Sequence, residues 1–217
     1  MNIEQARFNM IEQQIRPWDV LDQQVLDLLF VVKREDFTPP TYKSLAFADM
    51  EIPLGHGQVM LAPKIEARIL QELAVKKTDR VLEIGTGSGY LAALLGARAQ
   101  QVTTLEIVPE LAETARQNLA RAGIDNVAVE TANGAKGWAQ GAPYDVIVLS
   151  GSLLQVPSEI LAQLRIGGRL AAVVGEAPAM TAQLTTCTAE GVYSTVNLFE
   201  TVIPALEGLP PANAFRF

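Results

Sequence analysis

Three glycines, Gly85, Gly87 and Gly89, mark the stretch of this sequence with the clearest capacity for chemistry. They follow a short apolar segment, residues 80–84, and precede an apolar run that begins at Tyr90. This pattern predicts a strand that turns through glycine into a helix. Glycine permits the sharp turn and a close approach to a ligand, and the first N–H groups of the helix can bind polar groups. We therefore predict a nucleotide-binding turn.

The spacing of the glycines distinguishes two classes of ligand. A dinucleotide-binding turn has the pattern G-x-G-x-x-G, and its third glycine would fall at position 90, where this chain has tyrosine. Here the pattern is E-x-G-x-G-x-G, beginning at Glu83, which is typical of S-adenosylmethionine-dependent methyltransferases. A nicotinamide oxidoreductase is accordingly set aside. We predict that S-adenosyl-L-methionine is the cofactor, that S-adenosyl-L-homocysteine is its product, and that the cofactor contacts Glu83, Gly85, Thr86, Gly87, Ser88 and Gly89.

A second carboxylate, Glu106, supports this prediction. It ends the next apolar segment, residues 102–105, about twenty residues after the first glycine, where an acidic side chain can bind both ribose hydroxyls. Ile107 follows it, and we expect this residue to offer the adenine an apolar wall. The alternative interpretation is an ordinary tight turn with Glu106 as a solvated strand end.

The segment 49–63, DMEIPLGHGQVMLAP, is predicted to be a loop at the mouth of the cofactor site. It contains His56, the only histidine of the chain, and Gln58. Glycine-rich loops on a rigid scaffold often carry substrate contacts. His56 can serve as a general base for a hydroxyl or amine acceptor, although a lone loop histidine is more often a hydrogen-bonded structural residue. Ser150 and Ser152, at the end of a predicted strand, either line the acceptor pocket or form a plain turn.

Strands and helices alternate through the middle of the chain and predict an α/β fold. One helix is expected to begin near Pro109 and another to span residues 157–164. Strands are expected at residues 102–106, 126–130, 144–149 and 167–174. This order indicates a Rossmann-like parallel sheet with right-handed crossovers. Two later segments, residues 182–189 and 193–199, predict an antiparallel hairpin at the sheet edge.

The first 50 residues contain no catalytic constellation and are predicted to form helices. Apolar spacing indicates a helix over residues 2–15, and Asp19 is expected to cap a second helix that runs to about Val32. We interpret residues 1–50 as an N-terminal helical cap that belongs to the same domain as a methyltransferase domain at 51–217.

Composition limits the class of partner. The 217 residues are 49% hydrophobic and 19% charged, as in well-buried globular proteins, and the net charge of −7 argues against nucleic acid and anionic membranes. Cys187 is the only cysteine, so we expect a reducing compartment and predict a cytoplasmic protein. No secretory signal, membrane span or metal-ligand spacing is apparent, so no metal is predicted.

The ordered motifs resemble those of the protein-L-isoaspartate O-methyltransferase family over nearly the whole chain. IPLGHGQ resembles the loop of that family, VLEIGTGSGY its cofactor turn, NGAKGWAQGAPYDVIVL its later strand region, and IPALEG its closing segment. The resemblance implies a seven-stranded S-adenosylmethionine-dependent methyltransferase fold with an antiparallel final strand pair. It also implies methyl transfer to the side-chain carboxylate of isoaspartyl residues in damaged protein or peptide.

The substrate loop departs from this family pattern. The family reads Gln-Thr-Ile-Ser, and its serine is taken as the active-site residue, whereas this chain reads Gln58, Val59, Met60 and Leu61. Both hydroxyls are therefore absent. The catalytic residue is left open, and the candidate pocket residues are His56, Gln58, Val59 and Leu61.

Two further departures concern the cofactor and the acceptor. Asn133, followed by Gly134, stands where the family has aspartate in a Gly-Asp-Gly segment, a position expected near the adenine amino group. The asparagine carbonyl can still accept that hydrogen bond. Thr201 stands where the family has an arginine that can hold an anionic substrate. The cofactor half of the chain matches the family, and the substrate half has diverged.

Loss of the serine does not remove the chemistry, because a carboxylate with a pKa near 4 is already ionised at neutral pH and needs no general base. The resemblance therefore still implies a carboxylate of damaged protein or peptide as the acceptor, whereas the apolar Leu61 favours an acceptor other than isoaspartyl peptide. The alternatives are a methyltransferase for a small molecule or another protein site, and a non-catalytic cofactor-binding protein. The sequence makes no prediction of the oligomeric state.

Overall fold

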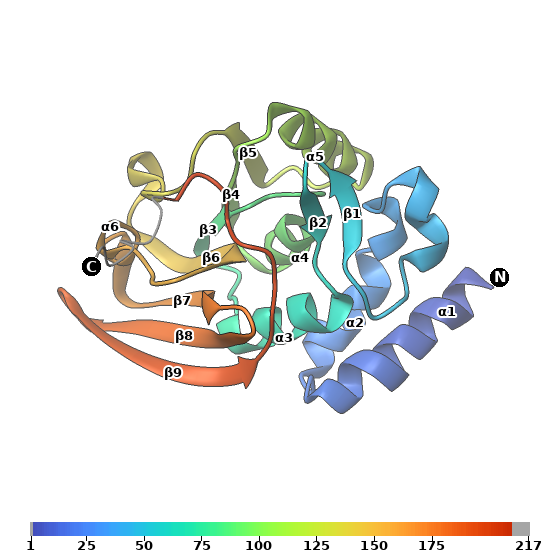
Figure 1. The fold of residues 1–217 in the computed structure, drawn as a ribbon, viewed down its shortest axis with the longest axis horizontal. Helices are drawn as coiled ribbons and strands as arrows, with labels where there is room; N and C mark the ends of the chain where they lie inside the picture. The colour runs from blue at the N-terminus through green and yellow to red at the C-terminus, as the bar shows by residue number, and fades with distance from the viewer. Residues whose placement is uncertain (1, 210–217) are drawn as a thin grey trace, which may run out of the picture.

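A computed structural model describes residues 2–209, and its centre is a sheet of seven strands in the order β5-β4-β3-β6-β7-β8-β9 (Figure 1). The strands are β3 (Arg80–Ile84), β4 (Gln101–Glu106), β5 (Val127–Thr131), β6 (Tyr144–Leu153), β7 (Leu164–Glu176), β8 (Ala179–Ala189) and β9 (Val192–Glu200). Strands β3 to β7 pair in parallel, while β8 and β9 pair antiparallel at the edge. The predicted parallel sheet and edge hairpin are confirmed.

The strand order reverses at β3, which lies between β4 and β6 in the sheet. From β3 the chain first builds outward through β4 and β5, and then returns to the opposite side with β6 and β7. Such a reversal opens a crevice at the carboxyl ends of the strands, where open α/β sheets bind their ligands. The fold therefore places the residues that follow β3, β4 and β6 around one cleft.

Helices and apolar side chains cover both faces of the sheet. Val81, Val102 and Val146 face a core made with α2 (Gln23–Val31), α3 (Pro63–Leu73), α4 (Tyr90–Arg98) and α5 (Pro109–Arg121). Leu82 and Ile147 face a second core that includes α6 (Ser158–Leu161). Because successive side chains of a strand point to opposite faces, a stretch of strand buried on both sides is apolar at nearly every position, as residues 146–149 of β6 are. No helix within residues 2–209 is long and apolar enough to cross a membrane.

The N-terminal residues form helices whose details differ from the prediction. The expected helix over residues 2–15 consists of α1 (Ile3–Met10) and a π-helical turn at Ile11–Ile15. Asp19 does not cap the second helix, because it closes a 3₁₀ turn with a left-handed backbone at φ 65°. Asp22 is the cap instead, and its side chain accepts a hydrogen bond from Gln24 N at 2.8 Å. The boundary between a cap and a main domain at residue 50 stays a prediction.

The segment 49–63 is a β-hairpin rather than the expected loop. Its strands, β1 (Ile52–Gly55) and β2 (Gln58–Met60), pair antiparallel. The turn runs through Gly55, His56 and Gly57, at φ values of 90°, 53° and 75°. Glycine tolerates such left-handed conformations, so the two glycines that suggested an irregular loop in fact close a tight hairpin. Farther along, α6 is shorter than the helix expected over residues 157–164, because β7 already begins at Leu164.

A buried arginine joins the N-terminal helices to this hairpin and to the sheet domain. Arg34 is 0% exposed and forms an ion pair with Glu66 of α3. It also donates hydrogen bonds to the carbonyl oxygens of Ala46, at 3.1 Å, and of Leu61. Its guanidinium carbon lies 5.2 Å from the ring centroid of Tyr90, the first residue of α4. One side chain therefore links four segments.

Replacing Arg34 should destabilise the whole fold. Arg34→Met leaves the buried Glu66 carboxyl and the carbonyl oxygens of Ala46 and Leu61 without their partner, and we expect a loss of about 3 to 5 kcal/mol in the free energy of unfolding. Urea unfolding followed by circular dichroism measures it. The control is Arg165→Met, which breaks a pair between the exposed Arg165 side chain and Asp145 and should cost far less. Equal losses in the two variants would contradict this account of Arg34.

Candidate active site

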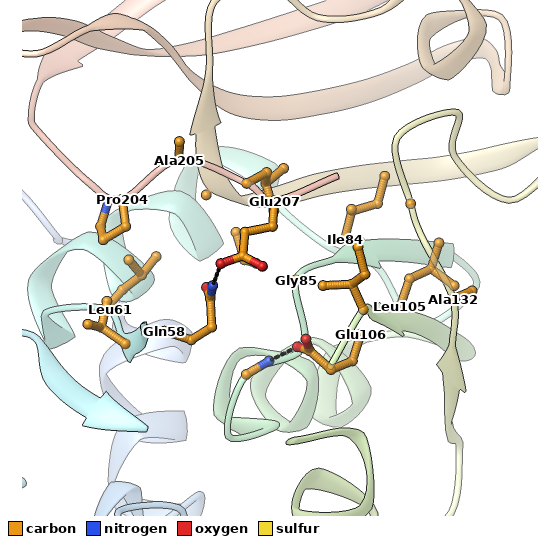
Figure 2. Close-up of a pocket in the computed structure, with 17 residues that line it drawn as sticks. Gln58, Leu61, Ile84, Gly85, Leu105, Glu106, Ala132, Pro204, Ala205 and Glu207 are labelled. Atoms are coloured by element: carbon orange, nitrogen blue, oxygen red, sulfur yellow. Dashed lines mark hydrogen bonds between the residues drawn. The ribbon is translucent and has the colours of Figure 1, made fainter. Parts of the chain in front are cut away.

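A cleft lies at the carboxyl ends of the central strands, between the β1–β2 hairpin and the segment 203–207 (Figure 2). Its space is about 610 Å³, including the part open to solvent. The segment after β9 runs back over the sheet (Figure 1), and its residues 204–207 line one side of the cleft. It is held there because Ser152 N donates to Pro204 O at 2.8 Å and Leu206 N donates to Ser152 O at 2.9 Å.

The glycine turn forms the floor of the cleft. Gly85 and Gly87 line it, at φ values of 98° and 54°. A Cβ added to Gly85 would lie 3.1 Å from Leu206 Cδ2, and one added to Gly87 would lie 3.2 Å from Leu54 Cδ1. Gly89 serves packing rather than the cleft, since its Cβ would lie 3.3 Å from the Ala115 side chain of α5. The absence of two side chains is therefore what keeps the cleft open.

Glu106 is fixed against this turn by its two carboxylate oxygens. One oxygen accepts a hydrogen bond from Gly87 N at 2.8 Å, and the other accepts one from Val108 N at 3.0 Å. Figure 2 shows the carboxylate in the cleft beside the turn. Backbone donors hold a carboxylate in one orientation without adding a competing charge. Glu106 is thus a preorganised acceptor at the end of β4.

The wall beyond Glu106 is apolar and closely packed. Ile107 lines the cleft and remains 36% exposed. Gly134 lines it too, and a Cβ there would lie only 2.4 Å from Ile84 Cγ2. Asn133 is not among the lining residues, because its amide nitrogen donates to Gly208 O at 3.2 Å and its oxygen accepts from Ala135 N at 2.8 Å. Its contact with a cofactor stays a prediction.

A smaller inner pocket adjoins the cleft and contains the remaining predicted turn residues, Glu83, Thr86 and Ser88. Glu83 is 0% exposed and accepts hydrogen bonds from Thr104 Oγ1 at 2.6 Å and Ser150 Oγ at 3.1 Å. Burial raises the pKa of Glu83 to about 8, against the lowering effect of these two hydrogen bonds. The Glu83 carboxyl is therefore mostly protonated at neutral pH, beneath the turn rather than in the outer cleft.

The acceptor side contains three of the four predicted pocket residues. Gln58, Val59 and Leu61 line the cleft, and both Val59 and Leu61 also line the inner pocket. His56 does not line either one, because it is exposed in the hairpin turn. Among the described residues, none that lines the cleft is a histidine, so the lining offers no imidazole as a general base. Leu61 is 6% exposed, so the wall that faces the turn is apolar.

The two candidate serines have different positions. Ser150 lines both pockets and donates its hydroxyl to Glu83. Ser152 is 1% exposed, and its hydroxyl donates to Ile203 O at 3.0 Å, so it anchors the C-terminal segment. Thr201 lies outside the lining residues, with its backbone N–H bonded to Met180 O.

Sequence reasoning did not identify the C-terminal wall. Pro204, Ala205, Leu206 and Glu207 line the cleft, and Gln58 Nε2 donates to Glu207 Oε1 at 2.7 Å across it (Figure 2). The pairing of β6 with Ala205 is a long-range contact that no local pattern announces. The motif IPALEG marks this segment in the sequence, but it did not predict a role for any single residue of the segment.

The fold and the glycine turn define the Rossmann-like class of S-adenosylmethionine-dependent methyltransferases. A solved structure from Plasmodium falciparum, described as a putative protein-L-isoaspartate O-methyltransferase in complex with S-adenosyl-L-homocysteine, superposes with a TM-score of 0.77 at 20% identity and covers 95% of this chain and 99% of that one. A second solved structure, named protein-L-isoaspartate O-methyltransferase, gives a TM-score of 0.79 at 25% identity over 93% of this chain and 66% of that one. The predicted fold class is confirmed.

Sequence comparison identifies the family within this class. The family model for protein-L-isoaspartate(D-aspartate) O-methyltransferase matches residues 5–203. A relative named protein-L-isoaspartate O-methyltransferase from Methanoculleus marisnigri is 41% identical, over 78% of this chain and 77% of its own. One named protein-L-isoaspartate O-methyltransferase 1 from Rhodopseudomonas palustris is 44% identical, over 78% and 69%. The chain belongs to the protein-L-isoaspartate(D-aspartate) O-methyltransferase family, as the sequence motifs predicted.

The buried Glu83 predicts a specific pH dependence of stability. Its pKa of about 8 in the folded protein lies above the ordinary value of 4.5, so between these values the folded state keeps a proton that the unfolded chain has lost. The contribution of Glu83 to the free energy of unfolding should fall as pH rises from about 4.5 to about 8, and then level off. The side chain in Glu83→Gln is neutral at every pH. This variant should therefore lack the part of the fall in the free energy of unfolding that Glu83 causes between pH 4.5 and about pH 8, as measured by urea unfolding. Identical pH profiles for the two proteins would contradict the raised pKa.

Proposed function

We propose that this chain uses S-adenosyl-L-methionine to methylate the carboxylate of isoaspartyl residues in damaged protein or peptide. The observation that carries the proposal is the family match over residues 5–203, together with a cleft at the reversal of strand order. The Plasmodium falciparum structure, which contains bound S-adenosyl-L-homocysteine, supports the choice of cofactor.

The residues of the cleft fit such a cofactor. Gly85 and Gly87 leave a cradle that side chains would fill, which allows a ligand to contact the backbone. Glu106 offers two fixed oxygens for a pair of hydroxyls, and Ile107 offers an apolar surface for a base. We propose that these four residues hold the nucleoside, with Gly134 behind it and with Thr86, Ser88 and Glu83 shaping the adjoining pocket. When bound, S-adenosylmethionine supplies an electrophilic methyl group on a positively charged sulfur.

The protein's contribution to methyl transfer is orientation and exclusion of water. An acceptor carboxylate is ionised at neutral pH, so no side chain has to remove a proton from it. The hairpin residues Val59 and Leu61 form an apolar wall opposite the glycine turn, and the C-terminal segment closes the other side. Holding the acceptor oxygen in line with the methyl group, in a site shielded from water, can supply most of the rate enhancement. Arg34 supports this geometry because it binds the carbonyl oxygen of Leu61.

The composition supports a peptide acceptor in a reducing compartment. The net charge of −7 disfavours nucleic acid as an acceptor, and Cys187 is a buried free thiol, which is usual in cytoplasmic proteins. We propose that the protein acts in the cytoplasm and that its acceptor is not a nucleic acid.

A labelled-methyl assay tests the proposed acceptor. The purified protein is incubated with labelled S-adenosylmethionine and either an isoaspartyl peptide or the same peptide with normal aspartate. We expect a base-labile methyl ester on the isoaspartyl peptide alone. Transfer to neither peptide, while calorimetry shows that the cofactor binds, would contradict the acceptor and leave the cofactor assignment intact.

A second candidate function, transfer to a different acceptor, is favoured by one observation. Leu61 presents an alkyl group to both pockets, so the wall offers no hydroxyl donor to an anionic acceptor. A hydrogen bond from a hydroxyl to a charged group is worth about 1.5 to 3 kcal/mol. The loss of this donor would weaken isoaspartyl binding and leave room for a less polar acceptor.

Leu61→Ser should therefore raise the rate of methyl transfer to isoaspartyl peptide, by about tenfold if the new hydroxyl contributes roughly 1.4 kcal/mol. The matched control is Ile52→Ser on the paired strand. Ile52 is 0% exposed and lines neither pocket, so this variant loosens the hairpin without adding a donor. An equal change in both variants, or no gain in a folded, cofactor-binding Leu61→Ser protein, would contradict the role given to Leu61.

A further inference from the structure

Among residues 2–209, every charged side chain that lines the two pockets is acidic. Glu106 and Glu207 are the ionisable residues that line the cleft, and Glu66 and Glu83 add two further carboxyl groups at the inner pocket, besides the phenol of Tyr90. The nearby cation is Arg34, which is 0% exposed and already bound to Glu66 and to two backbone carbonyl oxygens. Within the described residues, an acceptor that enters the cleft therefore meets no free positive charge from its lining.

These four carboxyl groups are not equally available to an acceptor. Glu83 is buried and mostly protonated, and Glu66 is neutralised by Arg34. Both oxygens of Glu106 accept backbone hydrogen bonds beside the glycine turn. Glu207 is exposed at the opposite side, and its contact is with the neutral amide of Gln58 at 2.7 Å. A neutral donor orients a carboxylate but leaves its charge in place, so among the described residues that line the cleft Glu207 carries the uncompensated charge.

The position of Glu207 is set by the sheet rather than by a free chain end. The segment that carries it pairs with β6 through Ser152 and Ala205, and Leu206 N donates to Ser152 O. On the other side of Glu207, Gly208 O accepts a hydrogen bond from Asn133 Nδ2 at 3.2 Å. Figure 2 shows the Glu207 and Gln58 side chains directed toward each other across the cleft. Because both residues line the cleft, an acceptor bound there lies close to this pair.

We propose that Glu207 is a specificity residue that selects acceptor peptides with a positively charged group beside the carboxylate to be methylated. This inference rests on the proposed function, since it takes the acceptor to be a peptide carboxylate. The negative charge of Glu207 repels the acceptor carboxylate. A lysine or arginine next to that carboxylate offsets the repulsion by pairing with Glu207. Peptides with acidic neighbours are disfavoured for the same reason. Gln58 keeps the Glu207 carboxylate oriented toward the cleft.

Two isoaspartyl peptides that differ only in the next residue, lysine or glutamate, test this selection. The quantity measured is the ratio of their kcat/KM values at low ionic strength. We expect the native protein to prefer the lysine peptide by about threefold to tenfold, chiefly through KM, since exposed charge pairs contribute about 1 kcal/mol. Glu207→Gln, which keeps the shape and the contact with Gln58, should bring the ratio close to one, and Glu207→Lys should reverse it.

The matched control is Glu190→Gln in the turn that joins β8 and β9, at the outer end of the hairpin (Figure 1). It changes the net charge by the same amount at an exposed position outside both pockets, so it should keep the native preference. An unchanged preference in Glu207→Gln, or an equal loss in Glu190→Gln, would overturn the proposal. High salt should abolish the native preference, because it screens exposed charges.

Calorimetric binding of the same peptides to the protein with S-adenosyl-L-homocysteine separates this inference from the proposed function. Binding that prefers the lysine peptide through Glu207, without any methyl ester formed, would refute the proposed reaction and retain the specificity residue. Methyl transfer with no charge preference would refute the specificity residue and retain the reaction. Binding of neither peptide would refute both.

Discussion

The buried ion pair between Arg34 and Glu66 is the interaction on which the rest of the structure depends. Two charges removed from water are tolerated only when their remaining donors and acceptors are satisfied. Arg34 meets this requirement with the carbonyl oxygens of Ala46 and Leu61 and by lying over the ring of Tyr90. Arg34 therefore fixes the N-terminal helices, the β1–β2 hairpin and the helix α4 after the glycine turn in one arrangement. Arg34 does not line the cleft, yet its hydrogen bond to the carbonyl oxygen of Leu61 helps to fix the position of the Leu61 wall.

The cleft itself is a consequence of topology and of missing side chains. The reversal of strand order at β3 separates the ends of β4 and β6, and Gly85 and Gly87 leave the space between them unfilled. Glu106 then supplies fixed oxygens on one side, and the segment after β9 supplies the other wall. Each part of the site comes from a different region of the chain, so no single motif contains it.

Local patterns in the sequence predicted the parts that local physics decides. The turn has positive φ at positions 85, 87 and 89, which glycine tolerates, and the three glycines therefore made the strand–turn–helix recognisable. The alternation of strands and helices likewise predicted the parallel sheet. Long-range contacts escaped prediction, because the partners of Arg34 and the pairing of Ala205 with Ser152 depend on residues far apart in the chain. The roles of Glu207 and of the Gln58 bridge followed only once those segments were brought together.

Where a local prediction was wrong, a second local signal competed with it. Asp19 and Asp22 are equally suitable helix caps by residue type, and the 3₁₀ turn before Asp19 decided in favour of Asp22. Gly55 and Gly57 suggested a loop, yet they bend two short strands into a hairpin. The resemblance to a family supplied information that residue patterns lacked, including the departures at Leu61 and Asn133.

A crystal structure of the protein with S-adenosyl-L-homocysteine tests the central claim most directly. The account predicts density in the cleft at the carboxyl ends of β3 and β4, with the ribose hydroxyls on Glu106 and the base against Ile107. Density in that cleft that leaves Glu106 without a ligand contact, or binding at another place on the protein, would contradict it.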